Sequence, residues 1–250
     1  MRDTFKDKEY FTKFISENII SLNQSLSFLT NGKVHPNRIN HFEYHTLEII
    51  LKILIAKYSC GFPINKLNDD YDKILDFLPK VFHQNVTKIK DKGGICKDQY
   101  RVEPHGVMLR LLSLGYLLNV SEQKFNKLVE TIDRDNISDN LYEFIIKAKF
   151  PNRSKRRPEE YDENHSVILK VYKNLRLAIK EQDKDIASQL ILDFLKKDFN
   201  HRHSGFYNSH KKDFFYGYWS FESVVKFNNY EKNININNLF ILNDYIKSRI

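Results

Sequence analysis

Three histidines lie close together in the sequence, His201, His203 and His210, with Asn200 and Asn208 among them. Neutral imidazoles are good zinc ligands, so this group is a candidate metal site for a hydrolase. Residues two apart do not share a face of a helix, however, and no nearby cysteine or ordered carboxylate completes a closed set of ligands. A His/Asn nuclease finger would need paired strands, which the sequence does not indicate here. We therefore expect a polar loop at a helix end, with no metal.

Glu103 and His105 flank Pro104, ahead of a strongly apolar segment. A carboxylate and an imidazole at this spacing are candidates for an acid/base pair. Proline in the first turn of a helix is an ordinary start signal, and polar residues beside it need no catalytic role. Because no nucleophile accompanies the pair, we expect no catalytic residue here.

A basic run, Arg153, Lys155, Arg156 and Arg157, is a candidate phosphate site. Such charge runs in linkers are more often simply solvated. The chain also has no GxxxxGK[ST], GxGxxG or GxSxG motif. The absence of these motifs makes the commonest enzyme classes less favoured without excluding others, and no residue in this run is expected to hold a cofactor.

The most distinctive string is Tyr216-Gly217-Tyr218-Trp219-Ser220-Phe221-Glu222, which holds the only tryptophan. Its aromatic residues are expected to pack the start of a helix against the rest of the domain. Gly217 permits a close approach of the backbone. A carboxylate in such a cluster is costly unless it is paired, so we expect Glu222 to meet an arginine or a backbone N–H.

These residues must be positioned by helices, because glycine and proline are scarce, at 8 and 6 of 250 residues, while 41% of the chain is hydrophobic. The predicted fold class is all-α, an antiparallel helical bundle in two parts. Apolar residues at three- and four-residue spacing predict helices over 7–29, 40–58, 64–78, 99–118, 122–131, 140–149, 167–179, 186–199 and 213–227. Residues 80–96 are expected to form an exposed loop or a short hairpin. Asp7 or Thr4, Ser121 and Ser138 are the expected N-caps.

A charged, proline-containing linker over 151–163 separates the two parts, since no apolar periodicity continues through it. We predict an N-terminal helical domain over 1–150 and a C-terminal helical domain over 151–250.

The formal net charge of +8 permits nucleic acid, an anionic membrane or an acidic protein as partner. No run of 18 uncharged apolar residues is present, and Met1–Tyr10 has no apolar core of a secretory signal. We expect a cytoplasmic protein with no membrane contact, in which Cys60 and Cys96 are thiols.

Three strings resemble motifs of the PoNi-type immunity proteins, which are bacterial inhibitors of a DNase toxin family. The segment 216–222 resembles their GYWxFE signature, with an upstream histidine such as His210; 56–61 resembles (A)xYSxG and 111–118 resembles LLSLGxLL. Arg2-Asp3 and Tyr10-Phe11 fit the family's opening, so the resemblance covers nearly the whole chain in order. The matched residues that look structural are Tyr58, Ser59, Gly61, Leu114, Gly115, Gly217, Tyr218, Trp219, Phe221 and Glu222.

The resemblance implies a helical protein in two parts that binds and neutralises a cognate toxin, a DNase of the PoNe type, without any chemistry of its own. It also implies a role in interbacterial competition, as the immunity partner of a type VI secretion effector. It carries over no toxin-contact residue, because specificity usually lies in variable surface residues.

A DNase must attract DNA and is usually basic, so an acidic inhibitor would suit it, whereas this chain is net positive. A local acidic patch would resolve the conflict. Of three acidic groups, at 69–76, 133–143 and 159–163, we favour the second as the toxin-contact surface. Its members are Asp133, Asp135, Asp139 and Glu143.

Two other functions remain open. A nucleic-acid-binding protein would use the basic surface, and its affinity would fall steeply with salt. A metal-dependent hydrolase would use His201, His203 and His210, and would carry metal after purification without a His tag.

Overall fold

The computed structural model describes residues 1–154, 170–199, 209–217 and 219–230, and in this part of the chain the fold is all-α apart from one small hairpin. The longer helices are α1 Lys8–Thr30, α2 Ile39–Cys60, α3 Ile64–Val81, α5 Val102–Leu117, α6 Glu122–Arg134, α7 Asn140–Lys149, α9 Lys173–Lys180, α10 Lys184–Asp193 and α11 Phe221–Tyr230. The short elements are 3-10 turns at Pro36–Arg38 and Ser209–Lys211, α4 Gln84–Thr87, strands β1 Lys88–Lys90 and β2 Cys96–Tyr100, and a π-helical turn at Phe194–Phe199.

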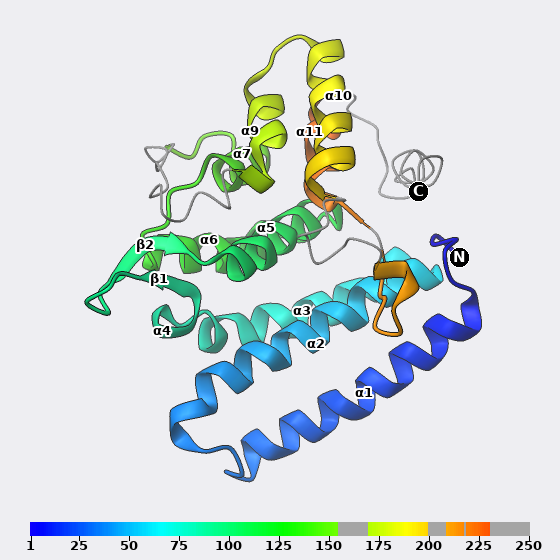
Figure 1. The fold of residues 1–250 in the computed structure, drawn as a ribbon, viewed down its shortest axis with the longest axis vertical. Coiled ribbons are helices and arrows are strands. Elements are labelled where there is room, and N and C mark those ends of the chain that lie inside the picture. The colour runs from blue at the N-terminus through cyan, green and yellow to red at the C-terminus, as the bar shows by residue number, and fades with distance from the viewer. Residues whose placement is uncertain (155–169, 200–208, 218, 231–250) are drawn as a thin grey trace.

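The helices form one continuous core. Along the first half of the chain, α1 packs on α2, α2 on α3 and α3 on α6, while α5 packs on α6 and α7. The later helices α9, α10 and α11 pack on one another and rise steeply from this first layer (Figure 1). Because α11 packs directly on α5, the C-terminal helices share a core with the N-terminal half.

Two helices are apolar on nearly all sides and lie at the centre. In α2, Leu47 and Leu54 are fully buried, and in α5 Leu111 and Leu112 are as well. A helix without a polar face must be covered on all sides, which is why other helices surround both. Arg110 and His105 are polar side chains on α5 that this central position brings to the C-terminal helices.

Several predicted boundaries were wrong. The helix predicted from residue 99 begins at Val102, because Cys96–Tyr100 pairs with Lys88–Lys90 as an antiparallel strand. The helix predicted from residue 213 begins at Phe221, since the chain before it passes through Gly217 at a φ of +139°. The N-cap of α7 is Asp139, not Ser138, because the Asp139 carboxylate accepts from the backbone N–H groups of Leu141 and Tyr142.

Other predictions hold or stay open. Asp7 caps α1 and Ser121 caps α6, as predicted. Most of the predicted linker and the start of the helix predicted over 167–179 lie outside the described residues. The boundary between residues 150 and 151 stays a prediction.

No helix in the described ranges is long and apolar enough to cross a membrane. Cys60 and Cys96 form no disulfide with each other.

Candidate functional site

The motif residues of the two halves meet at one junction. The Ser59 hydroxyl, near the end of α2, donates to the carbonyl oxygen of Tyr216 at 3.0 Å and accepts from the indole N–H of Trp219 at 2.8 Å. The Tyr58 ring packs edge-on against Trp219 and Phe221, with centroid distances of 4.8 and 5.5 Å. The YSxG and GYWxFE strings thus form a single contact between distant parts of the chain.

Glycine is required at two points of this junction. A Cβ on Gly217 would lie 2.3 Å from the Ser59 hydroxyl oxygen and 2.6 Å from the Trp219 ring. A Cβ on Gly61 would lie 2.8 Å from the backbone nitrogen of Met1. Both glycines also have positive φ, at +139° and +93°, which other residues adopt only with strain. These positions allow the backbone segments to approach one another closely.

The N-terminal segment covers the same junction. The backbone N–H groups of Arg2 and Asp3 donate to the carbonyl oxygen of Ser59 at 2.9 and 3.0 Å. The Arg2 guanidinium lies 4.7 Å from the centroid of the Tyr58 ring and donates to the Phe62 carbonyl oxygen at 2.8 Å. The opening residues that resemble the family therefore have a structural role.

A second contact of this segment reaches the residues before α11. The Tyr10 hydroxyl lies 2.8 and 2.9 Å from the carbonyl oxygens of Asp213 and Phe215. The His210 ring stacks on Phe5 at 4.8 Å, and burial lowers the pKa of His210. The upstream histidine of the signature is thus packed against the start of the chain.

Glu222 is buried at the start of α11, and burial raises its pKa. The charge of Arg110 on α5 opposes this rise, together with hydrogen bonds from the Ser220 side chain and the backbone N–H of Glu222. The charge of Arg110 and the hydrogen bonds at the start of α11 thus both favour the ionised form of this buried carboxylate.

A buried polar network joins α5, α7 and α9. One carboxylate oxygen of Asp139 lies 3.2 Å from His105 Nε2 and accepts from the Arg176 guanidinium at 2.6 Å. Burial alone would raise the pKa of Asp139, but His105 and Arg176 hold it well below its usual range. The His105 ring stacks on Tyr142 at 4.9 Å and contacts Tyr172 at 5.2 Å. Charge pairing in a dry interior is strong only when its partners are complete, so this network fixes how the three helices pack.

The acidic group predicted to contact a toxin lies mostly in the interior. Asp135 and Asp139 are fully buried and Glu143 is nearly so. Asp135 accepts from the Tyr100 hydroxyl at 2.7 Å and pairs with Arg134 at 2.9 Å. A carboxylate without exposed surface cannot touch a partner unless the protein rearranges. Its role as a toxin contact is still only a prediction, and in this structure these residues hold helices together.

Asp133 is the one member of this group whose side chain is partly exposed, and it forms a salt bridge with Arg153. The two guanidinium nitrogens of Arg153 donate to the two Asp133 carboxylate oxygens at 3.1 and 2.7 Å. Arg153, predicted as part of a solvated charge run, is therefore engaged, whereas Lys155, Arg156 and Arg157 lie outside the described residues.

Glu103 and His105 do not form an acid/base pair. His105 points to Asp139, whereas the exposed Glu103 lies beside Glu48 of α2 and forms a hydrogen bond with it. Burial and then the charge of Glu103 raise the pKa of Glu48 to about 7.

The predicted histidine group is described only in part, because His201 and His203 lie outside the described residues. Within the described ranges, no three His, Cys, Asp or Glu side chains are arranged to hold a metal ion.

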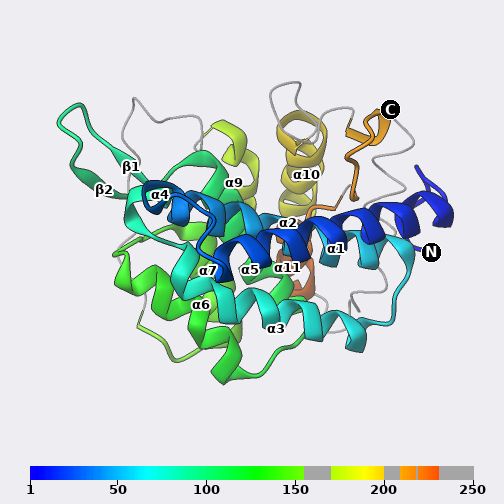
Figure 2. The ribbon, with the colours of Figure 1, turned by 90° about the horizontal axis from the view of Figure 1, so that it is seen from below.

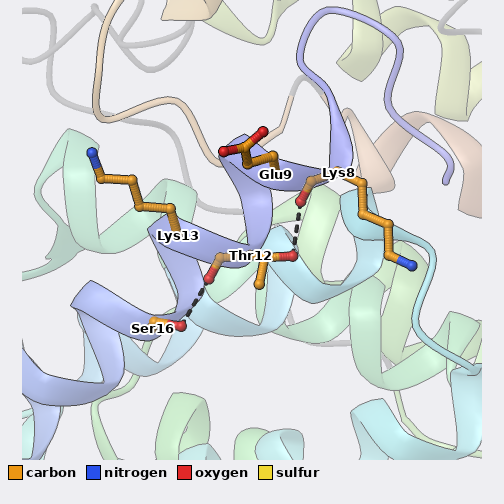
Figure 3. Close-up of a pocket in the computed structure, with 5 residues that line it drawn as sticks. All are labelled: Lys8, Glu9, Thr12, Lys13 and Ser16. Atoms are coloured by element: carbon orange, nitrogen blue, oxygen red, sulfur yellow. Dashed lines mark hydrogen bonds between the residues drawn. The ribbon is translucent and has the colours of Figure 1, made fainter.

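A shallow hollow of about 550 Å³ lies along the first turns of α1. It is lined by Lys8, Glu9, Thr12, Lys13 and Ser16, all from this one helix (Figure 3). The two hydroxyl groups donate to carbonyl oxygens one turn earlier in the same helix. The hollow therefore shows no convergent set of groups that could bind or transform a small molecule.

Comparison with known families gives a match across both halves. The family model described as PoNe immunity protein (PoNi), N-terminal, matches residues 2–130, and the model for the C-terminal part of PoNe immunity proteins (PoNi) matches residues 137–231. The chain belongs to the PoNi family of immunity proteins. Searches of the curated proteins and of the solved structures find no match.

The residues of the PoNi motifs form the buried junction between Ser59 and Trp219, so they contribute to the interior and not to the outer surface. Arg110, Asp139 and Arg176 were not singled out as a connected set from the sequence. One signal for Asp139 was its place directly before a predicted helix, where an acidic side chain is a strong N-cap.

Proposed function

We propose that this PoNi protein binds its cognate toxin directly and neutralises it, without catalysing a reaction. The observation that carries the proposal is the family match over both halves of the chain. The motif residues at the Ser59–Trp219 contact support it, because they are used to hold the fold and leave the outer surface to vary with the partner. The toxin is a DNase of the PoNe type, encoded next to the immunity gene, and the protein meets it in the cytoplasm.

A pull-down with the adjacent toxin, followed by a DNA-degradation assay, tests this function. We expect a stoichiometric complex in which DNA stays intact. The assay includes an unrelated nuclease as a control, because a protein that shields DNA by binding it would protect the DNA from that nuclease as well. If the toxin degrades DNA at the same rate with a molar excess of this protein, the proposed function is wrong.

The net charge of +8 favours a second candidate, nucleic-acid binding. In that case the protein would protect DNA from the unrelated nuclease as well. Its affinity for DNA would fall steeply as salt is raised, because phosphate contacts release counterions. We expect neither result.

A further inference from the structure

The β1–β2 hairpin extends beyond the helices in both views of the fold (Figures 1 and 2). Lys88 pairs with Tyr100 and Lys90 with Cys96, with an irregularity between the two pairs. An isolated two-stranded hairpin is marginally stable in water. Other contacts must therefore hold this one in place.

The base of the hairpin is fastened to the end of α6. The buried ammonium group of Lys88 donates to the Asp98 carboxylate at 2.7 Å and to the Asp135 carbonyl oxygen at 3.0 Å. The Tyr100 hydroxyl donates to the Asp135 carboxylate, and the Asn136 amide donates to Asp98, both at 2.7 Å. These bonds fix the direction in which the hairpin leaves the body.

The tip of the hairpin is ordered by its own bonds. One carboxylate oxygen of Asp91 accepts from the backbone N–H groups of Gly93 and Ile95, each at 2.9 Å. This turn presents the Ile95 side chain to solvent with 69% of its surface exposed, the highest value for a large apolar side chain in the described ranges. The turn is therefore ordered before any partner binds, and Ile95 is left exposed at its end.

The hairpin tip also carries two exposed lysines. The side chains of Lys90, at the end of β1, and Lys92, in the turn before Ile95, are both exposed. The carboxylates of Asp91 and Asp98 accept hydrogen bonds within the hairpin and at its base. The tip thus presents one exposed apolar side chain together with two exposed lysines.

We propose that the tip of this hairpin, residues 90–95, inserts into the toxin at an apolar socket rimmed by carboxylates. The inference rests on the proposed function and names the surface that would carry it. A rigid turn loses little conformational freedom on binding, and a binding hot spot is typically a side chain that fills a desolvated pocket, ringed by contacts that exclude water. A DNase that uses divalent metal ions holds them with carboxylates, and a toxin of this kind would offer an acidic rim at its catalytic cleft even where its DNA-binding surface is basic. A basic inhibitor can then act on a basic toxin.

The test measures binding of full-length variants to the adjacent toxin by titration calorimetry. Ile95→Asp should weaken the affinity by about 30-fold or more, because an anchor residue is replaced by a charge that repels the rim. Ile186→Asp is the matched control, since Ile186 on α10 is also an isoleucine and is 52% exposed. The control should bind within about threefold of the unchanged protein, as a residue outside an interface does.

A second arm tests the charges. The double variant Lys90→Glu and Lys92→Glu should associate more slowly with the toxin, because rim charges act mainly on the association rate. Raising the salt concentration should slow association of the unchanged protein and should no longer slow that of the double variant. Thermal unfolding of every variant should match the unchanged protein, since the substituted side chains are exposed.

The outcomes separate the two proposals. If the unchanged protein binds the toxin and Ile95→Asp binds equally well, the hairpin inference is wrong while the proposed function stands. Equal losses for Ile95→Asp and Ile186→Asp would also overturn it, because the effect would not belong to the tip. If the unchanged protein does not bind the toxin, both proposals fail.

Discussion

The hydroxyl oxygen of Ser59 accepts a hydrogen bond from the indole nitrogen of Trp219 at 2.8 Å and joins residues 160 positions apart. Both groups are buried, and the same hydroxyl donates to the Tyr216 carbonyl oxygen. One small side chain therefore satisfies two polar groups of the C-terminal half. This relationship gives the serine and the tryptophan of two distant strings one shared structural role.

Replacing this serine should destabilise the protein. Ser59→Ala leaves the Trp219 N–H and the Tyr216 carbonyl without their partner, and each unsatisfied buried group costs about 1–3 kcal/mol. We expect the free energy of unfolding to fall by about 2–4 kcal/mol in urea denaturation. Ser16→Ala is the control, because Ser16 is exposed and bonds only within its own helix. Similar losses for both variants would mean that the junction adds nothing specific.

Close packing around Gly115 predicts a second effect. A Cβ at this position would lie 2.3 Å from the Tyr71 hydroxyl oxygen and 3.1 Å from the Phe125 ring. The Tyr71 hydroxyl cannot move easily because it is buried and donates to the Leu111 carbonyl oxygen at 2.7 Å. Gly115→Ala should therefore lower the free energy of unfolding by about 1–3 kcal/mol, as overpacking does.

The control for that variant is Gly93→Ala at the hairpin tip, where the nearest atom to a Cβ would be 3.4 Å away. A change of less than about 0.5 kcal/mol is expected there. Thermal and urea denaturation of the two variants should rank them in this order, and the reverse order would contradict the packing described at α5.

The Asp139 network predicts a loss of stability in acid. Its pKa lies below the usual range in the folded protein, so on acidification the unfolded chain takes up this proton first. The network's contribution is complete above about pH 4 and is lost progressively as the pH falls below that value. Urea denaturation between pH 2 and pH 7 measures this slope.

Asp139→Asn isolates the charge in this network, because asparagine is also a good N-cap for α7. Near pH 7 we expect a loss of about 3–5 kcal/mol, since the buried guanidinium of Arg176 loses the charge of the Asp139 carboxylate. Below pH 4 the variant should lose stability less steeply than the unchanged protein. Parallel pH profiles would show that Asp139 does not carry the effect.

Glu48 predicts the opposite dependence on pH. Its pKa of about 7 in the folded protein lies above the value of a free glutamate, first because of burial and then because of Glu103. Between about pH 4 and pH 7 the folded state keeps a proton that the unfolded chain releases, so stability falls as the pH rises through this range.

Glu48→Gln should remove that penalty and raise the free energy of unfolding at pH 8 by about 1 kcal/mol, discounted for the partial exposure of the side chain. At pH 4 the variant and the unchanged protein should be equally stable. Glu17→Gln, at an exposed carboxylate of α1, measures the effect of removing a surface charge and its exposed ion pair with Lys13. An equal gain for Glu17→Gln at pH 8 would contradict the proposed penalty.

The sequence alone predicted most helices, because an amphipathic or buried helix shows its apolar spacing locally. The segments around Phe14, Leu54 and Phe125 fold into α1, α2 and α6 close to the predicted bounds. The motif strings also indicated the PoNi family, because short motifs in a fixed order can be recognised from the sequence without knowing which residues are in contact. Where local signals competed, as at residues 99–101, the prediction failed: strand pairing with Lys88–Lys90 decided the structure there.

Only the tertiary structure decided which charged residues are available to a partner. In the sequence, Asp135, Asp139 and Glu143 resemble an acidic surface patch, yet each is buried beside a cation or a hydroxyl from another part of the fold. The sequence predicted an exposed loop or a short hairpin over residues 80–96, but only the pairing of β1 with β2 shows that Ile95 lies at the tip with 69% of its surface exposed. Contacts between residues distant in the chain decide which side chains are buried and which charges are paired. Composition and periodicity describe only local stretches of sequence and cannot show those contacts.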